Sequence, residues 1–370
     1  MPEAASRPAW ADIDLGAITS NTAALRELVA PAAVCAVVKA NGYGHGAVEA
    51  ATAALAGGAT WLAVAFVEEG IALREAGIDA PVLLLSEPAI SAMATTVAHR
   101  LTPTVYSVTG VHAARDAGAV AVHLKVDTGM HRVGAQPAWL AEVARAIVDS
   151  GGMRLEGFWT HLAVADEPDK DATTKEQLRR FDDAREVIAA AGLVPEIVHA
   201  ANSAGAIAHP AARFDLVRCG IAVYGVPPAP ALDGRVALRP AMSVVAEVTH
   251  VRRVDAGEGI SYGHRYVTTA ETTIATVPLG YADGVPRRLG VERAPVLIGG
   301  QRRPIAGVVT MDQLMVDCGP DAAVAVGDEV VLIGRQGDAE ITAEDWAGRL
   351  DTIGYEVVCG IGPRVKRRYN

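Results

Sequence analysis

Short apolar runs alternate with longer alanine-rich segments over the first two thirds of the chain. Apolar runs of about four to eight residues predict buried strands, and apolar spacings of three and four predict helices. Eight strands are predicted to start near Val34, Trp61, Val82, Thr102, Ala121, Leu155, Ile197 and Val217. Helices are predicted between them, for example over 138–149 and 173–191. This alternation predicts an α/β fold, a closed (β/α)8 barrel of the TIM type.

The pattern changes after the proline-rich segment VPPAPALDGR. Beyond it, short β-branched runs such as VVAEVTHV, TTIATV, APVLI and EVVLIG are separated by glycine and proline turns. We therefore predict a barrel over residues 1–232 and a mainly β C-terminal domain over 233–370. The early run AWADIDL, at about 8–15, predicts one more strand, which pairs either with the barrel or with the β domain.

Composition fits a globular protein, because 51% of the 370 residues are hydrophobic and 21% are charged. The net charge of -10 argues against nucleic acid or an anionic membrane as a partner. No run approaches the roughly 18 apolar residues of a membrane helix, and the first residues do not resemble a secretory signal.

Four cysteines are scattered along the chain without a CxxC pair, and the histidines show no zinc-binding spacing. They are Cys35, Cys219, Cys318 and Cys359. Reduced thiols, no metal and a cytoplasmic location are therefore predicted.

Polar residues follow several of the predicted strands. In a (β/α)8 barrel the carboxyl ends of the strands meet at one mouth, where the chemistry takes place. The residues expected at this mouth are Lys39, Lys125, His161, His199, Asn202 and Ser203.

Lys39 differs from most of the five lysines. Lys170, Lys175 and Lys366 lie among charged neighbours, which is typical of an exposed surface. Lys39 instead follows the apolar run CAVV, whose burial would lower the ammonium pKa and favour imine formation with an aldehyde cofactor. The alternative is a lysine that only caps a barrel strand.

Two segments offer places for an anion. GYGHG precedes a helical stretch but lacks the dinucleotide-binding pattern, so a flexible turn explains it equally well. In HAANSAG, Asn202 and Ser203 can direct hydroxyl and backbone N–H donors at a phosphate. A plain helix cap is the alternative there.

The segment AVVKANGYGHG resembles the cofactor-lysine signature of the alanine racemases, and the likeness extends along almost the whole chain. The resemblance implies an isomerase that interconverts L- and D-alanine with pyridoxal 5'-phosphate. It implies that Lys39 holds the cofactor as an imine and that Tyr43 contacts its phosphate. It also implies a homodimer with shared active sites.

DLVRCGIAVYG resembles the family segment whose arginine meets the cofactor ring nitrogen, which assigns that role to Arg218. Gly220 and Ile221 would offer backbone donors to the phosphate. His161, in THLA, resembles the histidine that links this arginine to a catalytic tyrosine. The alternatives are an ion pair between Arg218 and Asp215, and a structural role for His161 in the core.

Racemisation needs proton transfer at both faces of the α-carbon, so two acid-base groups must flank the cofactor. Lys39 supplies one, and GISYGHRY resembles the motif that bears the other, Tyr262. In the family this tyrosine reaches the barrel mouth of a partner subunit. Without the resemblance, Tyr262 would be an ordinary aromatic residue of the β domain.

Further substrate contacts follow from the same resemblance. AGVVTMDQLMVD matches a turn in which the Met311 backbone N–H holds the substrate carboxylate and Asp312 orders the turn. Tyr281 in LGYADG and Tyr355 in IGYEVVC match residues that line the entrance, and Tyr355 also matches a phosphate contact.

Within KVDTGMHRVG, Arg132 matches an arginine beside the substrate carboxylate and the cofactor phenolic oxygen, while Lys125 matches a lysine that is often carbamylated. The chain departs from the pattern at Gly42, Thr310 and Val308, where alanine, cysteine or serine, and arginine are usual. None of these departures removes an acid, a base or a cofactor ligand.

Several other functions are open to the sequence. A broader-specificity amino-acid racemase would share every motif, and the product would serve either peptidoglycan precursor synthesis or D-alanine breakdown. A barrel-type decarboxylase would place a carboxylate at the ring nitrogen, where Arg218 stands. A non-catalytic pyridoxal-phosphate carrier would lack Tyr262 and Met311, and a cofactor-free hydrolase would be colourless.

Overall fold

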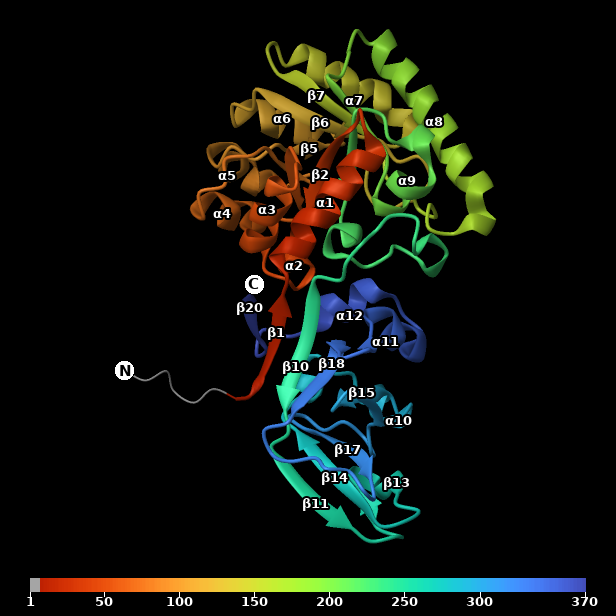
Figure 1. The fold of residues 1–370 in the computed structure, drawn as a ribbon. Helices are drawn as coiled ribbons and strands as arrows, with labels where there is room; N and C mark the ends of the chain where they lie inside the picture. The colour runs from red at the N-terminus through yellow and green to blue at the C-terminus, as the bar shows by residue number, and fades with distance from the viewer. Residues whose placement is uncertain (1–6) are drawn as a thin grey trace. The chain divides into compact units, whose positions relative to one another are not determined.

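The computed structural model describes residues 7–370, which form two compact units. One unit is Gly16–Arg239, and the other combines the described residues up to Leu15 with Pro240–Asn370. Figure 1 labels many of their elements.

The first unit contains eight parallel strands. They are β2 (Ala33–Val37), β3 (Trp61–Val64), β4 (Val82–Leu84), β5 (Thr104–Val105), β6 (Ala121–Lys125), β7 (Arg154–Trp159), β8 (Ile197–His199) and β9 (Leu216–Cys219). All eight lie where the apolar runs predict them. The largest offset is at β5, which starts at Thr104 instead of Thr102 because Thr102 forms an isolated bridge to Leu83.

The strands close into a barrel. They run in the orders β4-β3-β2-β9 and β5-β6-β7-β8, and the bridge between Leu83 and Thr102 joins one end of these two rows. At the other end, the Asp215 N–H donates to the Val198 carbonyl at 3.0 Å and the Arg218 N–H donates to the Ala201 carbonyl at 2.9 Å. The predicted (β/α)8 architecture is confirmed.

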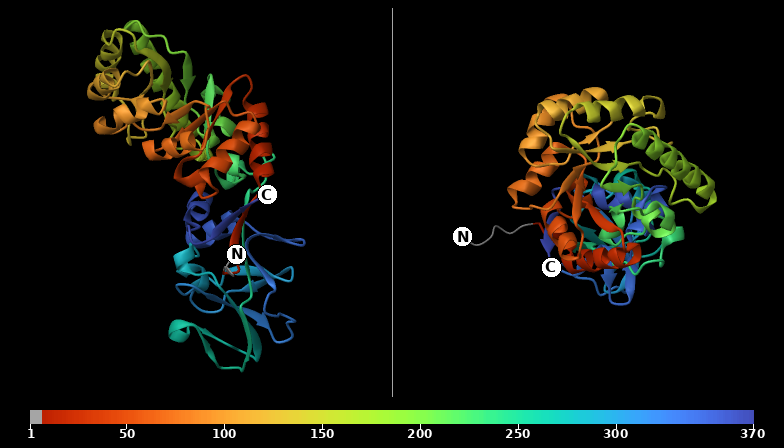
Figure 2. Two further views of the ribbon diagram at one scale, coloured as in Figure 1. Left: turned by 90° about the vertical axis from the view of Figure 1, so that its left-hand side faces the viewer. Right: turned by 90° about the horizontal axis from the view of Figure 1, so that it is seen from above.

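Helices connect the strands and lie on the outside of the barrel, as Figures 1 and 2 show. They are α1 (Leu15–Val29), α3 (Ala47–Ala56), α4 (Val67–Glu75), α5 (Met93–Ala98), α6 (Val108–Asp116), α7 (Pro137–Asp149), α8 (Asp171–Ala190) and α9 (Ser203–Ala208), whereas the short α2 (Lys39–Tyr43) is a left-handed turn after β2. Their apolar stripes cover the strands. In α7, for example, Leu140, Val143, Ala144 and Ile147 are buried at helical spacing.

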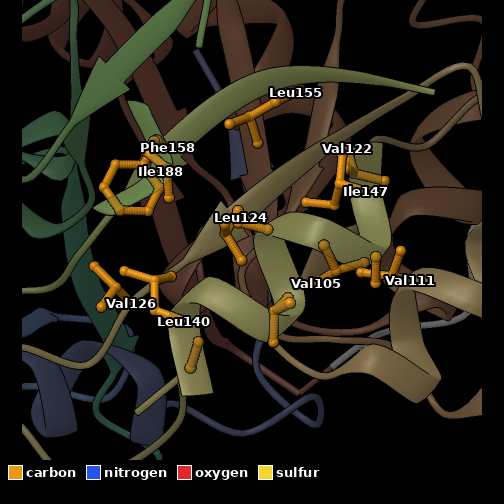
Figure 3. Packing of buried hydrophobic residues seen from close by; sticks show 14 of the residues in the cluster. Val105, Val111, Val122, Leu124, Val126, Leu140, Ile147, Leu155, Phe158 and Ile188 are labelled. Carbon is orange, nitrogen blue, oxygen red and sulfur yellow. The ribbon is translucent and has the colours of Figure 1, made fainter. Parts of the chain in front are cut away.

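One hydrophobic core fills the space between strands β5–β8 and helices α6–α8 (Figure 3). Val122 and Leu124 of β6 point into this core. Because successive strand residues point to opposite faces, His123 and Lys125 must point into the barrel instead. The barrel interior is therefore polar on this side, and its charged groups lie on the same strands as the outer core.

The second unit is mainly β. Its strands are β1 (Ala9–Ile13), β10 (Met242–Glu247), β11 (His250–Val254), β12 (Gly259–Ile260), β13 (Tyr266–Val267), β14 (Thr272–Val277), β15 (Pro295–Ile298), β16 (Gln301–Pro304), β17 (Leu314–Gly319), β18 (Glu329–Gln336), β19 (Ala339–Ile341) and β20 (Lys366–Tyr369). Its helices are α10 (Arg287–Val291), α11 (Ala343–Leu350) and α12 (Gly354–Gly360). Strand β1 pairs antiparallel with β10 and parallel with β20, so the early strand joins this sheet.

Candidate active site

Lys39 lies where the chain leaves β2 and enters a left-handed turn. Ala40, Asn41 and Gly42 have φ values of 52°, 53° and 62°, and Tyr43 also has a positive φ. A left-handed conformation costs a residue other than glycine about 1–2 kcal/mol. The turn is closed by the Gly42 N–H, which donates to the Val38 carbonyl at 2.9 Å. Backbone strain of this kind is typical of functional sites.

Arg218 lies at the carboxyl end of β9 and is buried, with 2% of its surface exposed. One terminal nitrogen donates to His199 Nδ1 at 2.9 Å. The other donates to the Thr160 and Ala200 carbonyls at 2.8 and 3.0 Å and to His161 Nδ1 at 3.2 Å. The Nε atom has no hydrogen-bond partner among residues 7–370.

No carboxylate pairs with Arg218 in the described part of the chain. Asp215, the alternative partner, accepts a hydrogen bond from the Val198 N–H at 2.8 Å. Burial lowers the Arg218 pKa to about 10, which still leaves the guanidinium charged at neutral pH. Its Cζ atom lies over the Trp159 ring, 4.4 Å from the ring centre, and such a contact stabilises a buried cation.

A chain of histidines continues from Arg218 into the barrel. Because a guanidinium only donates, His199 Nδ1 must be the acceptor, and the proton of this neutral ring lies on Nε2. That nitrogen is 3.0 Å from His123 Nδ1. His123 Nε2 in turn lies 3.5 Å from Glu156, which is a longer electrostatic contact. Burial lowers the pKa of both imidazoles, so both are neutral at pH 7.

Several cations share the barrel mouth. Burial, followed by the charges of Arg218, Arg132 and Lys39, lowers the pKa of Lys125 to about 7. Burial and the same cations, together with Lys125, hold the pKa of His161 well below its usual range. The structure thus brings these predicted barrel residues close enough to influence one another, and it keeps His161 neutral.

The Ser203 hydroxyl and the backbone of Gly220 lie beside this cluster. Ser203 Oγ accepts from the Gly220 N–H at 2.9 Å, which leaves the hydroxyl proton available to another acceptor. A Cβ on Gly220 would collide with the Tyr43 hydroxyl, so glycine is required there. Asn202 caps α9, as the plain-cap alternative expects. Ile221 begins the adjoining 3-10 turn.

In the β unit, Tyr262 is held by a strained backbone. Ser261 has φ 63° and ψ −176°, a conformation that is essentially restricted to glycine. Its Oγ donates to the Val308 carbonyl at 2.7 Å, which anchors the turn. Tyr262 itself is 74% exposed.

Tyr281 and Met311 lie on two turns that are bonded to each other. The Tyr281 N–H donates to the Thr310 carbonyl at 2.9 Å, and Asp312 pairs with Arg364 at 2.7 Å. Met311 is 53% exposed and Tyr281 is 44% exposed. The predicted substrate residues of this unit are therefore adjacent and accessible. The partly buried Tyr355 lies on α12.

Residues 7–370 contain no cluster of metal-ligating side chains, and none of their helices is long and apolar enough to cross a membrane.

A closed (β/α)8 barrel with lysine, arginine and histidine at its mouth, followed by a β unit, defines an enzyme whose chemistry takes place at the barrel mouth. Residues 13–228 match the family model described as alanine racemase, N-terminal domain, and residues 241–369 match that of the C-terminal domain. The chain belongs to the alanine racemase family.

Individual relatives agree with this assignment. An alanine racemase of Symbiobacterium thermophilum is 50% identical over 98% of this chain and 97% of its own length. That of Thermobifida fusca is 49% identical over 98% of each chain. Among solved structures, the enzyme from a D-cycloserine-producing Streptomyces lavendulae has a TM-score of 0.93 at 43% identity, covering 100% of this chain and 98% of its own. A Bacillus anthracis alanine racemase with bound L-Ala-P has a TM-score of 0.92 at 37% identity, covering 98% and 95%.

Three residues of this site have no role that a motif or the family resemblance assigns. His123 is two residues before Lys125 on the same strand, and this period-2 spacing is the signal that places both inside the barrel. Trp159 contacts two cations, with Lys125 Nζ 4.3 Å and Arg218 Cζ 4.4 Å from its ring centre. Glu69 contacts the backbone next to Lys39, and its position three residues after Phe66 is typical of a helix cap.

The three neutral histidines predict a stability that falls in acid. The pKa values of His123, His161 and His199 are lowered in the folded protein, so below about pH 6.5 the unfolded chain binds protons that the folded chain does not. Each ring lowers the unfolding free energy by about 1.4 kcal/mol per pH unit over the pH range in which the unfolded chain is protonated and the folded ring is neutral. Urea denaturation at pH 7.5, 6.0 and 5.0 measures this slope.

The His199→Gln variant should show a shallower slope than the wild type over the same range. The exposed His112→Gln variant is the control and should match the wild type. A stability that stays constant from pH 7.5 to 5.0 would contradict neutral burial of these rings.

Proposed function

We propose that the enzyme interconverts L- and D-alanine with pyridoxal 5'-phosphate bound covalently at Lys39. The observation that carries this proposal is Arg218, a buried guanidinium with no carboxylate partner and an Nε–H without an acceptor in the described chain. A buried donor of this kind needs an acceptor. A neutral pyridine nitrogen is such an acceptor.

The residues at the mouth fit the cofactor in three further ways. The amine of Lys39 lies in the cluster at the barrel mouth, close enough to Lys125 and His161 to lower the pKa of both, and an amine there can bind an aldehyde cofactor covalently. The Ser203 hydroxyl keeps its proton for a phosphate, and the Tyr43 hydroxyl lies beside it at Gly220. Gly220 donates its N–H to Ser203, so Ile221 is the better candidate for a direct backbone donor.

When bound, the cofactor withdraws electrons from the amino-acid α-carbon and makes its C–H acidic. Arg218 keeps the ring nitrogen unprotonated, so this withdrawal is moderate and rapid reprotonation is favoured over side reactions. Lys39 exchanges the proton at one face of the α-carbon, and the Tyr262 hydroxyl exchanges it at the other. His161, which is bonded to Arg218, positions this tyrosine.

We assign the substrate carboxylate to two donors, the Arg132 guanidinium and the Met311 backbone N–H. Asp312 orders the Met311 turn through its ion pair with Arg364. Tyr281 and Tyr355 line the entrance, and Tyr355 also contacts the phosphate. The alternative function is a broader-specificity racemase. Turnover of an amino acid somewhat larger than alanine therefore tests how large a substrate this entrance admits.

We propose that Lys125 carries a carbamate. With a pKa of about 7, a substantial fraction of this amine is neutral and nucleophilic at pH 7. Its nitrogen attacks the carbon of carbon dioxide, a C–N bond forms as one C=O π bond opens, and the nitrogen releases a proton to solvent. The resulting anion would attract Arg132 and orient it, whereas an ammonium repels it.

We further propose a homodimer in which a second copy supplies Tyr262, Met311 and Tyr281 to each barrel mouth. These side chains are 74%, 53% and 44% exposed on the single chain, although each is assigned to catalysis or substrate binding. Exposed apolar residues that are gathered on bonded turns mark an interaction surface.

A cytoplasmic location, and a role in supplying D-alanine for peptidoglycan precursors, complete the proposal. Two buried cysteines support the reducing compartment. Cys35 and Cys219 lie on neighbouring strands as unbridged thiols, and burial raises the pKa of both.

Racemisation of L-alanine by the wild type, Lys39→Ala and Tyr262→Phe tests the function. We expect loss of activity by at least about a hundredfold in each variant, because each removes one of two acid-base groups. Chiral chromatography measures D-alanine, and exchange of the α-proton in deuterium oxide reports each face separately. Tyr262→Phe should reduce exchange unequally for the two enantiomers.

Undiminished turnover by either variant would contradict the role proposed for the substituted residue. Equal rates with L-alanine and L-serine would favour the broader-specificity racemase.

Mixing the two inactive variants tests whether the active site is shared. In a heterodimer of Lys39→Ala and Tyr262→Phe chains, one site contains both an intact Lys39 and an intact Tyr262. We therefore expect activity to return after subunit exchange, measured by the same assay. If each chain builds its own site, the mixture stays inactive.

Carbon-13 NMR tests the carbamate at Lys125. Protein equilibrated with carbon-13 bicarbonate should show a carbamate carbonyl resonance that is absent from Lys125→Ala. The exposed Lys175 provides the control, because Lys175→Ala should keep the resonance. A spectrum without the resonance in the wild type, or electron density that ends at the amine when carbon dioxide is present, would count against the modification.

A further inference from the structure

Three backbone N–H groups converge on the carboxylate of Glu69. Oε2 accepts from the Ala65 N–H at 2.8 Å and from the Phe66 N–H at 3.1 Å, both in the loop that enters α4. Oε1 accepts from the Ala40 N–H at 2.6 Å, which belongs to the residue directly after Lys39. One side chain therefore connects the loop after β3 to the turn after β2.

The contact with Ala40 meets a need of the left-handed turn. The hydrogen bond that closes this turn starts from the Gly42 N–H, so the Ala40 N–H lies outside it and requires another acceptor. Ala40 and Asn41 both have positive φ values, which residues other than glycine rarely adopt. A charged acceptor bound at the first strained residue opposes relaxation of this backbone.

We propose that Glu69 is a positioning residue for Lys39. Its carboxylate fixes the peptide that joins Lys39 to Ala40 and so sets the direction in which the lysine amine leaves β2. Nothing in Glu69 needs to touch the substrate or the cofactor. The inference rests on the proposed function, because it assumes that the amine of Lys39 does the chemistry.

Glu69 has two tasks, which are to cap α4 and to hold the Ala40 N–H. A shorter side chain at this position separates them. Aspartate is able to cap a helix from the same third position, since the Asp345 carboxylate accepts from the Thr342 N–H at 2.9 Å at the start of α11. Glu69→Asp should therefore keep the bond to Phe66 at the start of α4. Its side chain is one methylene shorter, so it should lose the bond to Ala40.

Glu68→Asp is a matched control, because Glu68 is the neighbouring residue on α4, carries the same charge and is exposed. Glu69→Ala removes both tasks and shows the full effect. Four measurements on the purified full-length protein distinguish these variants. They are the melting temperature, amide hydrogen exchange over residues 39–46, the pyridoxal-phosphate affinity by absorbance titration, and kcat and KM for L-alanine.

For Glu69→Asp we expect a melting temperature close to that of the wild type. Exchange over residues 39–46 should be at least about tenfold faster, because a charge-assisted hydrogen bond is lost. The kcat should fall by about tenfold or more, since misplacement of a reacting group is costly, while KM for alanine changes by less than about threefold. Cofactor affinity should fall in parallel with kcat, and Glu68→Asp should match the wild type in all four measurements.

Two results would overturn the proposal. One is wild-type exchange over residues 39–46 in Glu69→Asp, whatever its activity, because the hydrogen bond between Glu69 and Ala40 would then not hold this segment. The other is faster exchange with wild-type kcat and cofactor affinity, because this hydrogen bond would then not position Lys39. Failure of the proposed function is seen separately, as absence of racemase activity in the wild type, and the exchange measurement does not depend on it.

Discussion

A buried guanidinium that has no carboxylate partner in the described chain is the constraint on which the candidate site depends. Arg218 is held by two carbonyl oxygens and two imidazoles, and all of these are neutral acceptors. An uncompensated buried charge is expensive, so the neighbouring histidines must stay neutral and accept its hydrogen bonds. Burial, followed by the charge of Arg218, lowers the pKa of Lys125 and His161. The arginine and the burial of its surroundings thus act together on the protonation states of the barrel mouth.

Strained backbone next to each proposed base is the second recurring feature. Lys39 precedes a left-handed turn, and Tyr262 follows Ser261, whose φ is 63°. In each case one side chain anchors the strained segment, Glu69 for the first and Ser261 itself for the second. Both proposed bases therefore lie beside a strained segment that a side-chain hydrogen bond anchors.

The sequence predicted the barrel well because each strand is a local apolar run with a clear period. It also placed Lys39, Lys125, His161 and Arg218 at strand ends, where topology alone brings them together. Long-range pairing is harder to predict. The partners of β1 are β10 and β20, and the division between the units falls at Arg239 and Pro240, beyond the proline-rich segment that marked it in the sequence.

Side-chain networks were harder still to predict, because they join residues that lie far apart in the sequence. The sequence contains His123, Trp159 and Glu69, but no local pattern shows that the first meets His199, that the second contacts two cations, or that the third reaches Ala40. Tyr262, Met311 and Tyr355 were assigned by family resemblance alone, since a tyrosine in a β domain has no periodic signal of its own. Their roles stay predictions.

In the proposed function, Arg218 faces an unprotonated ring nitrogen. Nitrogen-15 NMR of the enzyme loaded with pyridoxal phosphate labelled at the ring nitrogen measures the protonation state of that nitrogen. We predict the chemical shift of a neutral pyridine that accepts a hydrogen bond, unchanged between pH 6.5 and 9. The shift of a pyridinium in this range, or a shift identical to that of free cofactor, would contradict the account.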